Sequence, residues 1–275
     1  MTDPTSVAAP SSTKYDVLGV LVDAVTYDDV TDRIIDAARN AHGLSVSATA
    51  VHGVLEGVHD PVHAARLNAF DILTPDGQPV RWALNWLHHA KLRERVYGPE
   101  LMLRVCARAA QEEFPIYLYG STEDVLVPLK RNLEARFPGL KVAGSSTSRF
   151  GEIGGDAQAE IASQIRSSGA RIVFVGLGCP RQEVFTWGMR DQVSLPLLAV
   201  GAAFDFHAGL ATEAPAWMQR WGLQWLHRLA SDPKRLWRRY VLLNPEYVWR
   251  LLRQRAGQSS APAVASRPSA ERLPG

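Results

Sequence analysis

The stretch that most constrains the fold is IVFVGLGCPRQE, at residues 172–183. Its first four residues are apolar and mostly β-branched, which predicts a fully buried strand. Gly176 and Gly178 then form a turn, and Pro180 stands where its fixed φ suits the first position of a helix. Backbone N–H groups point outward from such a strand–turn–helix junction, so the turn is a candidate phosphate site. The alternative is an ordinary turn between a strand and a helix.

Similar units of strand, turn and helix recur along the chain. We expect strands at residues 15–22, 44–50, 70–74, 115–119, 140–143, 171–175 and 197–200. Helices of about 10–15 residues separate most of them, and Ser121 or Thr122 is expected to cap the helix that ends at Arg136. This alternation predicts an α/β fold, with a Rossmann-like parallel sheet flanked by helices. Ligands bind beyond the carboxyl ends of such strands, so the turns at 119–121, 176–178 and 201–205 should meet there.

Composition sets the domain limits and excludes several classes of protein. Residues 1–13 and 257–275 are rich in Ser, Ala and Pro and are expected to be disordered tails. Between them we expect a Rossmann-like domain at residues 14–230 and a C-terminal, membrane-associating helical appendage at residues 231–256. The N-terminus lacks the pattern of a signal peptide, and no apolar run reaches the length of about 18 residues that spans a bilayer. A net charge of +2 predicts no general affinity for nucleic acid. Two distant cysteines predict no zinc site or disulfide framework, which fits the cytosol.

The chain changes character from about Ala214, where tryptophans alternate with arginines. Pro233 and Pro245 are expected to open two short helices. Basic helices that carry Trp and Tyr on another face suit an anionic membrane surface. The alternative is that these aromatic residues pack on the core of the protein.

Several common nucleotide motifs are absent. Arg181 stands where a dinucleotide-binding G-x-G-x-x-G motif needs its third glycine, and the chain has no P-loop and no D-x-D pair. We therefore expect chemistry without a metal or cofactor, in which N–H groups and arginines stabilise negative charge. Asp76 follows a buried strand at a sharp turn, where it is either a general base or simply part of an Asp-Gly turn.

Short motifs in a fixed order resemble the WecG/TagA/CpsF family of bacterial glycosyltransferases. They are TPDGQPV (74–80), RVYGPEL (95–101), LYGS (118–121), FPGL (137–140), VGLGCPRQE (175–183), VGAAFDF (200–206), APAWM (214–218) and GLQWLHR (222–228). The resemblance covers residues 15–255, which is nearly the whole folded part.

The resemblance implies a metal-independent, inverting glycosyltransferase. Such an enzyme moves a hexose or N-acetylhexosamine from a UDP-sugar to a polyprenyl-diphosphate-linked saccharide. The product enters exopolysaccharide, capsule or teichoic-acid-type polymers. The enzyme would be cytoplasmic and peripheral on the inner face of the plasma membrane. An apolar patch left bare by an undocked appendage would favour a homo-oligomer.

The resemblance also implies the site residues. It makes Asp76 the base, and it assigns catalytic roles to Arg95, Gln182 and Ser47. The expected substrate-binding residues are Thr49, His52, Gly120, Ser121, Gly176, Gly178, Pro180, Glu183, Gly201, Phe204, Asp205, Arg235, Arg238 and Arg239. Many family members carry T-x-N where this chain has Ser47-Ala-Thr49, so the donor sugar stays open. His52 is either a polar contact that replaces the missing amide or a structural histidine.

Two other functions stay open from the residues alone. One is a non-catalytic, nucleotide-binding protein of the membrane surface, which would tolerate Asp76→Asn. The other is an NAD-linked enzyme that modifies sugars, which a cofactor titration would reveal.

Overall fold

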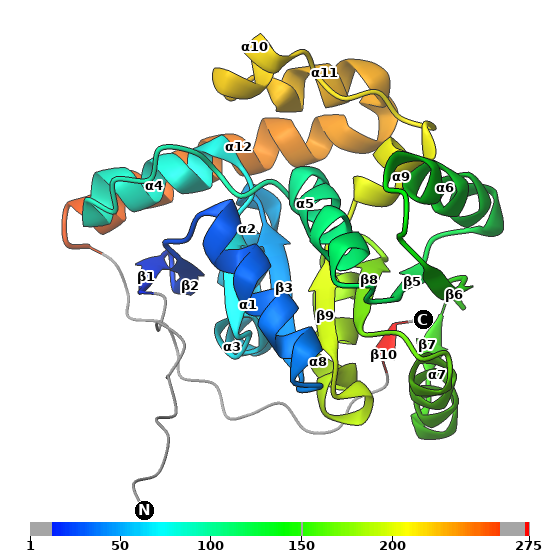
Figure 1. Ribbon diagram of the computed structural model, residues 1–275. Coiled ribbons are helices and arrows are strands. Elements are labelled where there is room, and N and C mark those ends of the chain that lie inside the picture. The colour runs from blue at the N-terminus through cyan, green and yellow to red at the C-terminus, as the bar shows by residue number, and fades with distance from the viewer. Residues whose placement is uncertain (1–12, 150, 259–272, 275) are drawn as a thin grey trace, which may run out of the picture.

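A parallel six-stranded sheet forms the centre of the protein (Figure 1). The computed structural model describes residues 13–149, 151–258 and 273–274. The strands lie in the order β4 (Ile72–Pro75), β3 (Leu44–Thr49), β9 (Pro196–Ala199), β8 (Ile172–Gly176), β5 (Ile116–Gly120) and β6 (Val142–Ser146). All five ladders are parallel, so the carboxyl ends of the strands share one edge. The predicted Rossmann-like fold is confirmed.

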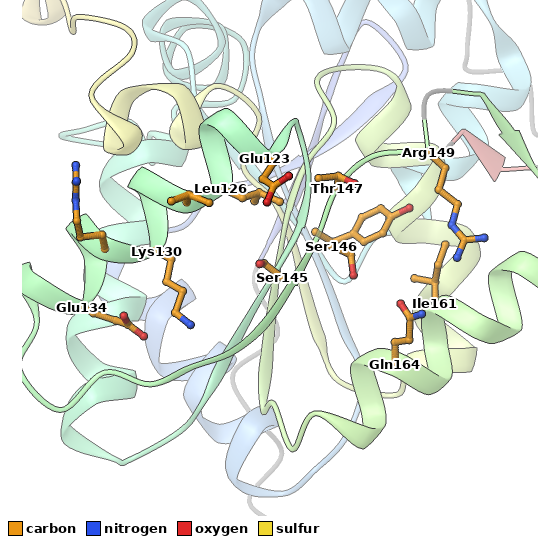
Figure 2. Close-up of a pocket in the computed structure, with 13 residues that line it drawn as sticks. Glu123, Leu126, Lys130, Glu134, Ser145, Ser146, Thr147, Arg149, Ile161 and Gln164 are labelled. Carbon is orange, nitrogen blue, oxygen red and sulfur yellow. The ribbon is translucent and has the colours of Figure 1, made fainter.

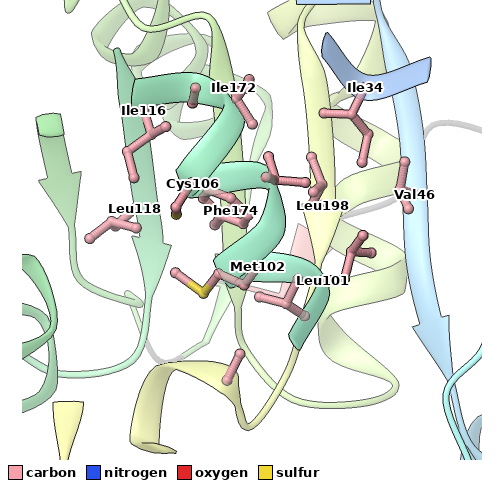
Figure 3. Packing of buried hydrophobic residues seen from close by; sticks show 14 of the residues in the cluster. Ile34, Val46, Leu101, Met102, Cys106, Ile116, Leu118, Ile172, Phe174 and Leu198 are labelled. Carbon is pink, nitrogen blue, oxygen red and sulfur yellow. The ribbon is translucent and has the colours of Figure 1, made fainter. Parts of the chain in front are cut away.

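Helices cover both faces of the sheet. Alternate residues of a strand point to opposite sides, and since apolar residues occupy both sides, both faces must be buried. Ile172 and Phe174 of β8 face one cluster, which contains α1 (Tyr27–Arg39), α5 (Gly98–Gln111) and α6 (Glu123–Arg136). Figure 3 shows Met102 and Cys106 of α5 packed against this side of the sheet. Val173 and Val175 face the opposite cluster, with α7 (Gly155–Ser167) and α8 (Arg181–Val193).

A third apolar cluster lies beyond β4. It joins the hairpin β1 (Lys14–Val17) and β2 (Val20–Asp23) to α2 (Val51–His59), α3 (Pro61–Asn68) and α4 (Gln78–His88). The prediction of one strand over residues 15–22 is wrong. Leu18 and Gly19 both have positive φ, so the chain reverses there and the two halves pair in an antiparallel hairpin.

The C-terminal helices gather at one end of the molecule (Figure 1). They are α10 (Ala216–Arg220), α11 (Gln224–Ser231) and α12 (Pro233–Arg255), and they follow α9 (Ala203–Ala208). The prediction that Pro245 opens a helix is wrong, because α12 runs through it as one helix. Tyr247 and Leu251 pack into the third cluster just beyond that proline, and their burial favours a continuous helix. Among the described helices, none combines the length and apolarity needed to cross a membrane.

Local details differ from the predictions at two helix starts. Thr122 stands at the N-cap position of α6, but no side chain caps this helix. Ser121 has a φ of 61° and lies one residue before the cap. Pro180 is the N-cap of α8 rather than its first residue.

The expected tails fall mostly outside the described residues, which exclude 1–12, 259–272 and 275. Leu273–Pro274 form the short strand β10, which pairs with β7 (Glu152–Ile153). The Leu273 side chain is buried against Gly188 of α8.

Candidate functional site

A polar cavity of about 470 Å³ lies at the carboxyl ends of the strands. The three turns expected to meet all contribute to its lining, with Ser121 from the first, Gly176 to Gly178 from the second, and Gly201, Ala202, Phe204 and Asp205 from the third. Gly176 is needed for this arrangement, since a Cβ there would stand 2.5 Å from the ring of Phe204. The glycine therefore lets Phe204 pack directly over the end of β8.

The floor of this cavity contains a buried hydrogen-bonded group. Glu183, on the first turn of α8, accepts hydrogen bonds at one oxygen, Oε1, from Ser47 Oγ at 3.0 Å and from Gln182 Nε2 at 2.9 Å. Burial raises the pKa of Glu183 above the usual carboxyl range, and these hydrogen bonds oppose the shift. The side-chain amide oxygen of Gln182, Oε1, has no protein partner among the described residues, and Gln182 lines the cavity. Glu183 thus positions an amide that is available to a ligand.

Asp76 lines the polar cavity and comes directly after β4 in the chain. Its Oδ2 accepts a hydrogen bond of 2.9 Å from the backbone N–H of Gly98, which fixes the carboxylate. Burial raises the pKa of Asp76, while Arg95, the Gly98 N–H and Arg228 act to lower it. A carboxylate whose pKa is raised is a stronger base than an exposed aspartate.

A second, largely apolar cavity of about 400 Å³ adjoins the first. Its walls come from α4, α11, α12 and the segment between α10 and α11, and the aromatic lining residues are Trp82, Trp221, Trp225, Tyr240 and Tyr247. The two cavities share five lining residues, Ala50, His52, Asp76, Tyr97 and Arg228. Asp76 therefore has access to a polar space on one side and an apolar space on the other.

Arg95 holds the C-terminal helices against the rest of the protein. Its guanidinium donates to the side-chain oxygens of Gln224 at 2.6 Å and Gln219 at 3.0 Å, and it stacks 4.2 Å over the ring of Tyr97. Gln224 in turn donates to the Tyr97 hydroxyl at 2.7 Å. Arg95 lines the apolar cavity and not the polar one, so its contacts connect α10 and α11 to the edge of the site.

Further contacts anchor α12 beyond Pro245. Glu246 Oε1 lies 2.8 Å from Nε2 of His59 on α2, and Tyr247 is fully buried. The side chain of Gln254 bonds to the N–H of Leu18 and to the carbonyl of Asp16 in the N-terminal hairpin. Tyr247 lines the apolar cavity together with Asp76, so α12 forms part of the enclosure around Asp76.

Most of the predicted site residues line the polar cavity. They are Thr49, His52, Asp76, Ser121, Gly176, Gly178, Gln182, Glu183, Gly201, Phe204 and Asp205. Thr49 is buried, and its hydroxyl has no partner among the described residues. His52 also lies 3.4 Å from the carboxylate of Glu56.

The other predicted residues have different positions. Ser47 lies beneath the cavity, bonded to Glu183, and Gly120 and Pro180 are not among the lining residues. A Cβ at Gly120 would stand 2.8 Å from the carbonyl oxygen of Gly176, so this glycine serves the packing of β5 on β8. The side chains of Arg235, Arg238 and Arg239 lie outside what the structure describes.

Sequence reasoning missed two polar side chains that line both cavities, those of Arg228 and Tyr97. Both stand inside motifs that carry the family resemblance, GLQWLHR and RVYGPEL, and that was the available signal. The backbone N–H of Gln182 belongs to the strand–turn–helix junction whose N–H groups were expected to point outward. It donates instead to the carbonyl of Gly178 at 2.9 Å, within the turn. Across the described ranges, no three His, Cys, Asp or Glu side chains are grouped so as to hold a metal ion.

Comparison with known proteins identifies the family. The glycosyl transferase WecG/TagA/CpsF family matches residues 15–261. A relative from Bacillus spizizenii is named N-acetylglucosaminyldiphosphoundecaprenol N-acetyl-beta-D-mannosaminyltransferase. It is 30% identical over 199 residues, which cover 72% of this chain and 74% of the relative. A protein of the same name from Bacillus subtilis is 29% identical over 189 residues, covering 68% and 71%. The chain belongs to the glycosyl transferase WecG/TagA/CpsF family.

Proposed function

We propose that this protein moves a hexose or N-acetylhexosamine from a UDP-sugar to a polyprenyl-diphosphate-linked saccharide, in the synthesis of a bacterial cell-surface polysaccharide. The observation that carries the proposal is the position of Asp76 between a polar and an apolar cavity. A direct displacement needs a base where the donor sugar meets the acceptor hydroxyl. The names of the two Bacillus relatives support a polyprenyl-linked acceptor.

The reaction is a single displacement with inversion at the anomeric carbon. Asp76 takes the proton of the acceptor hydroxyl while its oxygen forms the new bond to the sugar. The bond between that carbon and the UDP oxygen breaks, and UDP leaves with the electron pair. The raised pKa of Asp76 favours this proton transfer, and the Gly98 N–H holds the carboxylate in place.

The polar cavity is the donor site of this proposal. The N-terminus of α8 favours negative charge, and the guanidinium groups of Arg181 and Arg228 line the same space. These groups would stabilise the developing charge on UDP without a metal ion. Thr49 and Gln182 offer a hydroxyl and an amide oxygen with no protein partner in the described structure, and we assign them to the sugar.

The apolar cavity is the acceptor site. Trp82, Trp225 and Tyr247 suit the first isoprene units of a lipid better than they suit a nucleotide. Large exposed side chains gather on the helices around this cavity. They are Trp82 and Trp86 on α4, Trp217 on α10, Leu226 on α11, and Trp237, Val241, Leu242, Trp249 and Leu252 on α12. Together with the arginines of α12, they suit the anionic inner face of the plasma membrane, where the lipid acceptor lies.

Release of UDP from a panel of UDP-sugars tests the proposal. The protein is mixed with a polyprenyl-diphosphate-linked N-acetylglucosamine acceptor in vesicles, with EDTA present. We expect one UDP-sugar to give acceptor-dependent UDP release that survives EDTA. Binding of UDP without turnover of any sugar would favour a nucleotide-binding protein. Binding of NAD with no UDP release would favour the sugar-modifying enzyme.

A further inference from the structure

A third cavity of about 630 Å³ lies at the open edge of the sheet, away from Asp76. Figure 2 shows Lys130 and Glu134 of α6 on one side of it, and Ile161 and Gln164 of α7 on the other, with Ser145 and Ser146 between them. None of its lining residues lines either cavity at Asp76. Its size is within the range of about 300–1,000 Å³ that small-molecule sites occupy.

The lining of the cavity includes a tyrosine whose hydroxyl is buried. Tyr119 is fully buried and lines the cavity, and its ring stacks on Phe185 with centroids 4.2 Å apart. Its hydroxyl has no partner among the described residues. Burial raises the pKa of Tyr119 to about 12, so the group stays protonated and able to donate. Since an unsatisfied buried hydroxyl is costly, this group indicates a ligand or an ordered water.

The charges around the cavity are close to balanced. Lys130, Arg131 and Arg149 line it together with Glu123 and Glu134. Arg149 also forms a 2.7 Å ion pair with Glu160, so the other charged lining residues are two cations and two carboxylates, all on α6. A phosphate or another anion needs donors and positive charge, whereas sugar hydroxyls both donate and accept. The hydroxyls of Ser145, Ser146 and Thr147 add groups that do both.

The geometry of β6 argues against an added peptide strand. β6 pairs only with β5, so its outer edge has no strand partner in the described structure. The ladder pairs Ile116 with Val142 but Tyr117 with Gly144, so Ala143 is an extra residue in β6. Such a bulge bends an edge strand and makes it a poor template for another strand.

We propose that this cavity binds a neutral saccharide, held by the Tyr119 hydroxyl and by the balanced charges of α6. The exposed side chain of Val127 and the buried Ile161 would contact the apolar faces of the sugar rings. The site goes beyond sugar transfer, because it is separate from Asp76 and does not require turnover.

Saturation-transfer NMR on the full chain tests this site. The probes are cellobiose, mannobiose and N,N′-diacetylchitobiose, with glucose 1-phosphate as the charged comparison. We expect at least one neutral disaccharide to bind, and more tightly than glucose 1-phosphate. Tyr119→Phe removes only the hydroxyl and should weaken binding about threefold to tenfold.

Two further variants keep the test decisive if Tyr119→Phe fails to fold. Ser145 is exposed, and Ser145→Arg should fill the cavity and abolish binding. Ser167→Arg, an exposed position at the end of α7 outside the cavity, should leave binding unchanged. The proposal is overturned if no disaccharide binds, if the sugar phosphate binds more tightly, or if neither cavity variant weakens binding.

Discussion

The two cavities that meet at Asp76 are built from different parts of the chain. The polar cavity comes mainly from turns at the ends of β3, β5, β8 and β9, and the turns after β5, β8 and β9 each carry a short motif. The apolar cavity comes mainly from helices more than a hundred residues beyond Asp76, which Arg95 and Tyr247 hold in place. In this account the sheet supplies the donor site and the appendage supplies the acceptor site. Variants that damage one cavity should therefore leave the substrate of the other largely unaffected.

The largest difference between the effects on the acceptor and on UDP should come from a chain that ends at Ala230. It lacks α12, and with it Tyr240, Leu243 and Tyr247 of the apolar wall. We expect transfer to vesicle-borne acceptor to fall at least about a hundredfold, because several buried apolar contacts are lost. The affinity for UDP, measured by calorimetry, should stay within about tenfold. A chain that ends at Gln258 retains all three helices and is the control. Full transfer by the shorter chain would contradict the assignment of the acceptor site to the appendage.

Substitution of Arg228 tests one of the five residues that line both cavities. Arg228→Ala should lower kcat/KM about tenfold to a hundredfold, since a charge-assisted contact to the leaving UDP is lost. The loss should also raise the pKa of Asp76 further, because Arg228 lowers it. Transfer requires the ionised carboxylate, so the acid limb of the pH–rate profile should move to higher pH. Arg220→Ala, an exposed position on α10, is the matched control. A profile that stays in place would contradict this role.

Substitution of Trp225 tests the role of the apolar cavity alone. Trp225→Ala should raise the KM for the lipid acceptor about tenfold, while the KM for the UDP-sugar is unchanged. Trp86→Ala removes an exposed tryptophan of α4 that lines neither cavity, and it serves as the comparison. Equal effects of both variants would mean that general membrane contact, and not the cavity, determines the acceptor KM.

The smallest effect should come from Glu183→Gln, which keeps the shape of the group beneath the polar cavity. Burial raises the pKa of Glu183, so this carboxyl stabilises the fold below the ordinary carboxyl pKa, and that contribution is lost as the pH rises through the raised value. The Gln variant does not titrate. Urea unfolding should therefore show it gaining stability relative to wild type between acidic and mildly alkaline pH. A relative gain by the wild type over the same range would contradict the assigned direction.

Local sequence patterns predicted the sheet and much of the polar cavity. The strand at 172–176 and the glycine turns after β8 and β9 depend on residues adjacent in sequence, so their motifs were sufficient. The hairpin at Leu18 and Gly19 was missed because alternation of apolar residues continues across its turn. The continuous helix through Pro245 was missed because its stability depends on packing against distant parts of the chain.

Contacts between distant residues were beyond the reach of the sequence. Ser47 and Glu183 are 136 positions apart, and nothing near either residue indicates their hydrogen bond. Arg95 was expected to have a catalytic role, and nothing near it in the sequence indicates that its guanidinium contacts Gln219 of α10 and Gln224 of α11. The apolar cavity could not be predicted for the same reason, since it forms only where the appendage packs on α2 and α4.

The most direct test of the account is the rate of sugar transfer by Asp76→Asn, measured with saturating UDP-sugar and acceptor and with EDTA present. Calorimetry with UDP on the same protein reports whether the polar cavity is intact. We expect transfer to fall at least about a hundredfold, the usual minimum for a lost general base, while the Kd for UDP stays within about threefold. An unchanged transfer rate would contradict the assignment of Asp76 as the base and would direct attention to Glu183 and Asp205, the other carboxylates of the polar cavity.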